Sequence, residues 1–70
     1  MEKNHLSYYV IVYDGVISIN NEVDHLQYGT FEEMLNYLDE CKKEYIGCGY
    51  LASVSIIKDG DEIDREIIHF

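Results

Sequence analysis

With 70 residues the chain is limited to one domain, and its 14 acidic side chains against 5 Lys and Arg give a net charge of −9. A hydrophobic content of 47% excludes a disordered acidic tail, and no stretch reaches the roughly 18 apolar residues of a membrane helix. Acidity of this degree disfavours binding to nucleic acids and anionic membranes and favours basic partners. We therefore expect a single acidic domain over residues 1–70.

The N-terminal residues lack the apolar run after a basic stretch that marks a signal peptide, so we expect a cytoplasmic protein. In that compartment the two cysteines, Cys41 and Cys48, would stay reduced. A chain this short buries only roughly 60% of its unfolded surface, which makes its own core marginal. Domains of this size commonly gain stability from a disulfide, a metal or a second copy.

The first predicted element is a strand over residues 7–13, which are β-branched and aromatic and follow a polar segment, residues 1–6, that we expect to fray. Asp14-Gly15 separates this strand from a second apolar run at residues 16–19. An Asp-Gly pair in this position predicts a two-residue hairpin, because both turn residues need positive φ. One face of the hairpin would carry Val10, Val12, Ile17 and Ile19, and the other Tyr9, Ile11, Tyr13, Val16 and Ser18.

The next segment, residues 20–29, keeps no hydrophobic period, and we expect a loop with at most a short extended piece. Residues 30–45 then predict a helix that begins at a capping box, in which Thr30 and Glu33 satisfy each other's backbone amides. Gly47 marks its C-terminal end. Its apolar stripe consists of Phe31, Met34, Leu35, Leu38, Cys41 and Tyr45.

The last two elements are strands over residues 50–58 and 61–70, joined by a second Asp-Gly turn at Asp59-Gly60. A two-residue loop would pair Lys58 with Asp61 and Ile56 with Ile63. One face would then hold Ala52, Val54, Ile56, Ile63 and Ile67. The opposite face of the last strand would hold Glu62, Asp64, Glu66, Ile68 and Phe70.

The predicted fold class is α+β, with the order β-β-α-β-β and one helix packed on one face of a four-stranded antiparallel sheet. The other face would be uncovered, and it would show Tyr9, Ile11, Tyr13, Leu51 and Ile57. An apolar patch of this kind is large for a small monomer, so we expect a homodimer through this face or through a strand edge. A one-residue slip in either hairpin would exchange the faces, so the sequence leaves the dimerising face open.

Carboxylates are the side chains that best indicate a function. Alternation along the last strand would point Glu62, Asp64 and Glu66 the same way at a spacing of about 6.6 Å, which is of the order of the phosphate spacing along DNA. Charges that only protect an edge strand from aggregation are the alternative explanation. The predicted partner-binding set is Asp59, Asp61, Glu62, Asp64 and Glu66 in the hairpin, with Glu32, Asp39, Glu40 and Glu44 on the helix.

Other site chemistries find little support in the sequence. The acidic turn that follows Asp59 has its glycine at the second position rather than the sixth, so it does not match a calcium-binding loop. The histidines His5, His25 and His69 are scattered, and the two cysteines are seven residues apart, which does not match a zinc site. Cys48 as a catalytic nucleophile is a weak alternative. We therefore expect a protein that is not an enzyme and that uses no cofactor.

Small size, acidity, several tyrosines and the carboxylate set together resemble the phage-encoded host-takeover inhibitors, several of which are DNA mimics. Within that group the chain is similar to the acidic Bacillus phage inhibitor of the histone-like protein HU. The resemblance implies a homodimer in the host bacterial cytoplasm that occupies the DNA-binding surface of an HU-like protein and displaces DNA.

A second resemblance is local and covers about ten residues. The segment Tyr28-Gly-Thr-Phe-Glu-Glu-Met-Leu is similar to the start of the helix in HicB-type antitoxins, although much of this match follows from the capping box itself. It implies the alternative function, an antitoxin-like or other protein-binding module that uses a Tyr-rich sheet face or an edge strand. Tyrosine suits such a surface because it brings a large contact area at low entropic cost.

Overall fold

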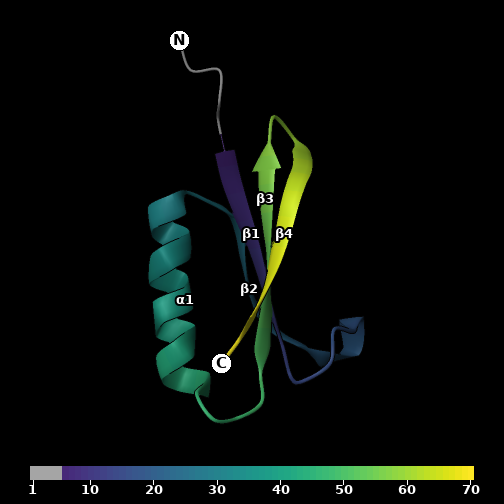
Figure 1. Cartoon of the computed structure of the whole chain (residues 1–70), viewed down its shortest axis with the longest axis vertical. Coiled ribbons are helices and arrows are strands. Elements are labelled where there is room, and N and C mark those ends of the chain that lie inside the picture. The colour runs from purple at the N-terminus through teal and green to yellow at the C-terminus, as the bar shows by residue number, and fades with distance from the viewer. Residues whose placement is uncertain (1–5) are drawn as a thin grey trace.

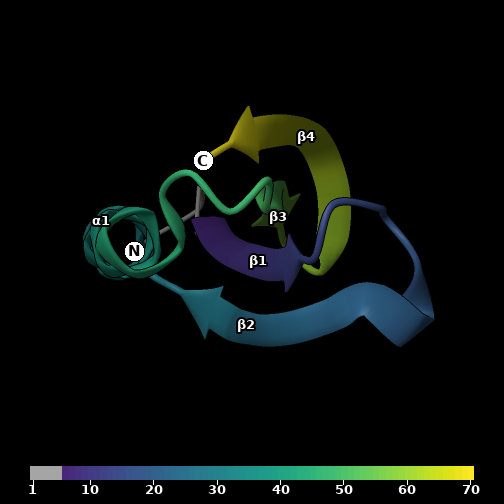
Figure 2. The ribbon, with the colours of Figure 1, turned by 90° about the horizontal axis from the view of Figure 1, so that it is seen from below.

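The computed structural model describes residues 6–70 as a four-stranded antiparallel sheet with one helix on one side (Figure 1). The strands are β1 (Leu6–Tyr13), β2 (Glu22–Gly29), β3 (Leu51–Lys58) and β4 (Asp61–His69), in the spatial order β2-β1-β3-β4 (Figure 2). The helix α1 (Phe31–Tyr45) connects β2 to β3, and a short 3-10 helix η1 (Ile19–Asn21) precedes β2. The predicted α+β class and the β-β-α-β-β order are confirmed.

Residues 1–5 of the expected frayed segment lie outside the described residues, whereas Leu6 begins β1. Across residues 6–70, α1 is the longest helix, and no helix has the length and apolarity needed to cross a bilayer.

The start of α1 is set by residues close together in the chain. The Glu33 amide donates to the Thr30 hydroxyl at 3.1 Å, and the Thr30 amide donates to the Glu33 carboxylate at 2.8 Å. This is the predicted capping box, and it satisfies two of the amides that a helix leaves without partners at its first turn. Beyond the C-terminus, Gly47 adopts a φ of +79°, which glycine reaches without steric cost.

The core lies between α1 and the helix-facing side of the sheet. Val10 and Val12 of β1 are fully buried, and Ala52 and Val54 of β3 lie beside them. Met34 and Cys41 of α1 pack against this layer from the helix side, and Tyr8 of β1 completes the cluster. The helix packs mainly against β1 and β2. β4 lies at the opposite edge of the sheet from β2.

The first hairpin differs from its prediction. β1 pairs with residues 22–29, with Tyr13 opposite Glu22, and the run at residues 16–19 is part of the connecting loop. Two hydrogen bonds close that loop: the Asp14 amide donates to the Asn21 carbonyl at 2.9 Å, and the Asn21 side-chain amide donates to the Asp14 carbonyl at 3.1 Å. The longer pairing wins because it gives β1 an eight-residue partner and brings Leu26 against the core.

The second hairpin has the predicted turn but a different register beyond it. Asp59 and Gly60 have φ values of +53° and +89°, as a two-residue turn requires, and Lys58 pairs with Asp61. Ile56, however, pairs with Asp64 and not with Ile63, because Ile63 is an extra residue in β4. Such a bulge reverses the faces of all the residues that follow it.

Both edge strands carry a bulge of this kind. Val23 is the corresponding extra residue of β2, between the pairs Tyr13–Glu22 and Val12–Asp24. In a regular strand, residues three apart point to opposite faces, but across a bulge they share one. An ion pair spans the bulge at Val23, from Glu22 to His25 at 3.2 Å when His25 is protonated, and another spans the bulge at Ile63, from Glu62 to Arg65 at 3.1 Å. β2 has a further irregularity between the pairs Tyr8–Gly29 and Val10–Leu26.

The side of α1 that faces β2 holds a small titratable cluster. The Tyr37 hydroxyl is buried beside Cys41 and Asp24 without a hydrogen bond of good geometry to either. Burial, followed by the nearby Cys41 and Asp24, raises the pKa of Tyr37 above its usual value of about 10. Burial is also the main cause that raises the pKa of the Cys41 thiol.

The capping box can be tested by substitution at Thr30. We expect Thr30→Ala to lower the free energy of unfolding by about 1 kcal/mol, because an orphan amide of the first turn loses its acceptor. Thr30→Ser keeps a hydroxyl at the cap and should stay close to the wild type. Urea unfolding followed by circular dichroism measures both. Equal losses in the two variants would contradict a role for the hydroxyl.

The Tyr37 cluster predicts a loss of stability at alkaline pH. Because the pKa of Tyr37 is raised in the folded state, its contribution to the free energy of unfolding is fully present below the unfolded pKa of about 10. That stability is lost as the pH rises further. We expect Tyr37→Phe to be nearly neutral at pH of about 8, because the hydroxyl has no partner, and to lose less stability than the wild type above pH of about 10. Urea unfolding midpoints of the wild type and Tyr37→Phe, measured at a pH of about 8 and above a pH of about 10, test this. Tyr13→Phe, on the opposite sheet face, is the control.

Candidate functional site

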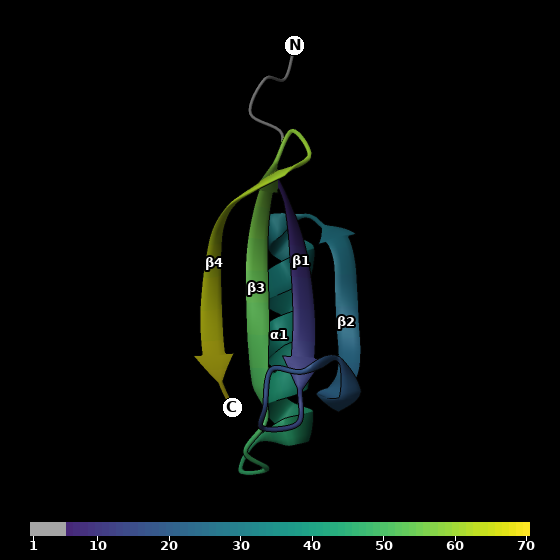
Figure 3. The same cartoon turned by 90° about the vertical axis from the view of Figure 1, so that its right-hand side faces the viewer.

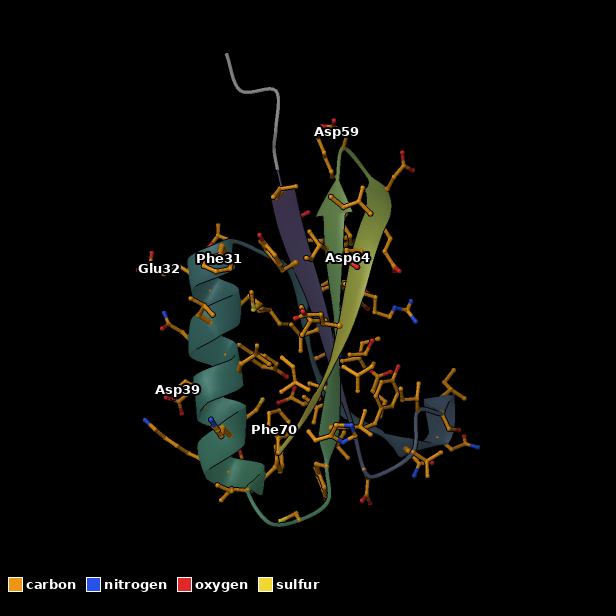
Figure 4. All side chains as sticks on the ribbon, viewed as in Figure 1. Phe31, Glu32, Asp39, Asp59, Asp64 and Phe70 are labelled. Atoms are coloured by element: carbon orange, nitrogen blue, oxygen red, sulfur yellow. The ribbon has the colours of Figure 1, made fainter. Side chains whose placement is uncertain are left out.

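The β3–β4 hairpin carries the densest group of carboxylates in the described chain (Figure 4). Asp59 and Asp61 lie exposed at its tip, next to Gly60. Further along, Glu62 lies opposite Ile57 on the face away from the helix, and its carboxylate accepts a hydrogen bond from Arg65. The hairpin therefore presents negative charge at its tip and on its sides.

The predicted row of Glu62, Asp64 and Glu66 on one face is wrong. The bulge at Ile63 leaves Glu62 on the open face and turns Asp64 and Glu66 to the helix side, opposite Ile56 and Val54. The physical reason is the count of residues between paired positions, which is one more on β4 than on β3. Asp64 and Glu66 remain a same-face pair, and both are exposed.

The helix carboxylates do not form one group. At about 3.6 residues per turn, Glu32 and Asp39 share a surface, and Figure 4 shows both pointing away from the sheet. Glu40 and Glu44 instead lie on the same side of α1 as Glu33. The Glu33 side chain lies next to Gly29 of β2, so this side of the helix faces β2. Asp39 is paired with Lys43 at 3.3 Å, an exposed i,i+4 pair.

The side of the sheet away from α1 is uncovered over most of its area (Figure 3). We call it the open face. It contains every residue of the predicted dimer interface: Tyr9, Ile11, Tyr13, Leu51 and Ile57. Leu51, however, is only 7% exposed, so it has little surface left to give to a partner. Near the β1–β2 loop, Val16, Ile17 and Ile19 are exposed and add apolar surface.

The open face also holds residues of β2 that the sequence did not indicate. The Tyr9 ring stacks on His25 at a centroid distance of 6.3 Å and meets Tyr28 edge-on at 5.4 Å. Tyr28 adopts a φ of +56°, which is uncommon outside glycine. These residues were missed because the irregularities in β2 break the period-2 alternation by which a strand is recognised.

Cys48 lies exposed in the turn after α1, where its thiol is 3.9 Å from the Ile46 carbonyl. Over residues 6–70 no three or more His, Cys, Asp or Glu side chains are grouped so that they could hold a metal ion, and no pocket is detected. The candidate sites on this part of the chain are surfaces: the hairpin, the open face, and the flank between α1 and β4. No family model, curated protein or solved structure matches the chain.

Proposed function

We propose that the protein is a non-enzymatic, acidic DNA-mimic inhibitor that binds a basic DNA-binding protein of the HU type and competes with DNA. The observation that carries this proposal is the β3–β4 hairpin, whose exposed carboxylates outnumber its two basic residues, Lys58 and Arg65. These carboxylates are Asp59, Asp61, Glu62, Asp64 and Glu66. We place the activity in the bacterial cytoplasm, that of the host if the protein is phage-encoded.

The bulge changes the kind of mimicry that is proposed. With Glu62 on one face and Asp64 and Glu66 on the other, the hairpin does not reproduce a line of phosphates. It instead places negative charge at the hairpin tip, with Asp59 and Asp61, and on the helix side, with Asp64 and Glu66. This arrangement suits a basic partner that contacts DNA over more than one surface. Asp64 and Glu66 are two residues apart on one strand, so about 6.6 Å separates them along it.

The charge of the whole chain supports the same proposal. A net charge of −9 repels nucleic acid and steers basic proteins toward the surface. Exposed charges are screened by salt, so such a complex weakens as ionic strength rises. Because few carboxylates here have cationic partners, most of the charge is free to act on another molecule: among residues 6–70 the salt bridges are Glu22–His25, Asp39–Lys43 and Glu62–Arg65.

A homodimer through the open face is part of the proposal. Two copies at −9 repel each other, so they can meet most easily where charge is balanced. On the open face Glu62 has a cationic partner in Arg65, and Glu22 has one in His25 when the imidazole is protonated. The apolar residues between them are half-buried in the single chain, and a second copy would cover them.

An alternative function is a protein-binding module that uses the same open face for a different protein. The cluster of Tyr9, His25 and Tyr28 favours it, because aromatic side chains are enriched where proteins bind each other. In that case the face would be free in solution and the hairpin charges would matter less than the aromatic rings.

The carboxylate proposal predicts a charge-specific loss of binding. We expect a double substitution, Asp64→Asn with Glu66→Gln, to weaken binding to purified HU by roughly tenfold or more at low salt and to reduce its salt dependence. Fluorescence anisotropy with labelled HU, with and without competing duplex DNA, measures both effects. Circular dichroism checks the fold of the variant.

The matched control removes the same charge from another surface. Glu40→Gln with Glu44→Gln lies on the β2 side of α1, away from the hairpin, and should change the affinity by less than about threefold, since only long-range attraction is lost. No binding of HU by the wild type, or equal losses in the two double variants, would overturn the proposed recognition by the hairpin.

The dimer proposal predicts a specific effect at Ile67, which lies on the open face opposite Ser53 and is 42% exposed. We expect the wild type to sediment as a dimer and Ile67→Glu as a monomer, because the substitution places a charge inside the interface. Leu35→Glu, a similarly exposed position at 48% on the helix, should leave the dimer intact. A monomeric wild type would contradict the dimer and favour the alternative function.

A further inference from the structure

The flank between α1 and β4 is an apolar surface that the fold leaves partly uncovered. On the helix, Phe31, Leu35, Leu38 and Tyr45 follow one another at spacings of four, three and seven residues, so they form one stripe. The opposite stripe, with Glu33 and Tyr37, faces β2. The first stripe therefore faces β3 and β4. At its C-terminal end, Tyr45 confirms this direction by its ring contacts: 4.7 Å to Tyr50, which precedes β3, and 6.4 Å to Phe70, which follows β4.

The sheet side of this flank comes from β3 and β4. Ile56 and Ile68 are partly buried and pack against the core from this side. Asp64, opposite Ile56, and Glu66, two residues before Ile68, point to the helix side because of the bulge at Ile63. Since α1 packs mainly on β1 and β2, it does not cover these carboxylates, and both are exposed.

Two side chains of the stripe keep much of their apolar surface exposed. Phe31 is 55% exposed although its ring lies 5.6 Å from that of Tyr8, and Leu35 is 48% exposed. Leu35 has Glu32 and Asp39 as its i−3 and i+4 neighbours, which are the positions that touch it on a helix surface. An exposed apolar centre is therefore bordered by carboxylates from the helix on one side and from β4 on the other.

The cations near this flank do not cancel its charge. Lys43 is engaged with Asp39, and the Arg65 side chain is on the open face with Glu62. Lys42 lies at the C-terminal part of the same stripe, beyond Leu38. Lys58 points to the same side of the sheet as Ile56, at the hairpin end of the flank. Four carboxylates, those of Glu32, Asp39, Asp64 and Glu66, thus border the apolar centre against two lysines, Lys42 and Lys58, near its ends.

We propose that the α1–β4 flank, defined by Phe31, Leu35, Leu38, Ile56, Asp64 and Glu66, docks a basic amphipathic segment of the partner protein. An apolar stripe framed by carboxylates is complementary to a segment with one apolar face and flanking Lys or Arg. A second copy of this chain is the wrong occupant, because it would bring its own carboxylates against these. This inference rests on the proposed function and adds to it an apolar contact that DNA itself does not offer.

The test uses two fluorescein-labelled peptides of about 18 residues made of Leu and Lys, with identical composition. One places Leu at helical spacing and so has an apolar face, and the other is scrambled. We expect the ordered peptide to bind the wild type roughly tenfold more tightly than the scrambled one, because only it can cover Leu35 and Phe31. Amide shifts in an NMR titration should concentrate on α1 and β4.

Variants assign this preference to the flank. Leu35→Gln, a good helix former, should remove most of the tenfold preference, whereas Ile17→Gln should keep it. Ile17 is the matched control, since it is 51% exposed and belongs to the β1–β2 loop. Circular dichroism checks that both variants fold.

Three results would overturn the proposal. Equal binding of the two peptides would show that charge alone attracts them, which leaves the electrostatic function standing and removes the flank. Equal effects of the two variants would place the apolar contact elsewhere. A dimeric wild type together with a monomeric Leu35→Gln variant would show that the flank is a self-association surface. Failure of the proposed function itself is distinguished by the absence of binding to HU.

Discussion

Ile63 has no partner residue on β3, and this unpaired residue sets the direction of the side chains that follow it in β4. Because side chains alternate along a strand, one extra residue turns Asp64 and Glu66 toward the helix side and Ile67 toward the open face. The distribution of charge over the hairpin, the composition of the open face and the acidic border of the α1–β4 flank all depend on it. Val23 has the equivalent effect in β2.

Bulges at both edges also have a protective role that is compatible with binding. A flat edge strand is a template for unwanted pairing, and bulges and charges on an edge interrupt such pairing. Here the bulges at Val23 and Ile63 are each spanned by a close pair, Glu22 with His25 and Glu62 with Arg65. Exposed pairs of this kind contribute little to stability, typically below about 1 kcal/mol. Their main effect is on the distribution of charge over the open face, where Arg65 offsets Glu62 and a protonated His25 offsets Glu22.

The two sides of the sheet consequently differ in character. The open face combines half-buried aromatic and aliphatic side chains with balanced charges, which suits contact with a like-charged second copy. The helix side combines the exposed part of the α1 stripe with unpaired carboxylates, which suits a basic partner. In the proposed complex the two surfaces act together, since a dimer through the open face would leave the hairpin tips, the helix-side carboxylates Asp64 and Glu66, and both flanks outward.

Local interactions explain what the sequence by itself determined. The capping box of Thr30 and Glu33 and the turn of Asp59 and Gly60 involve residues within three positions of one another, so their energetics are visible in the sequence. The apolar period of α1 and the alternation in β1 and β3 were equally visible, and they led to the correct fold class and to the β1 and β3 residues of the open face.

Tertiary structure decided what depends on competition between distant segments. Asp14-Gly15 has the same two residues as Asp59-Gly60, yet it forms no two-residue turn, because pairing β1 with residues 22–29 satisfies more backbone groups and brings Leu26 to the core. The positions of the bulges likewise depend on how each edge strand pairs with its neighbour. The sequence thus determined how many carboxylates the hairpin carries, whereas only the pairing of β3 with β4 decided where they point.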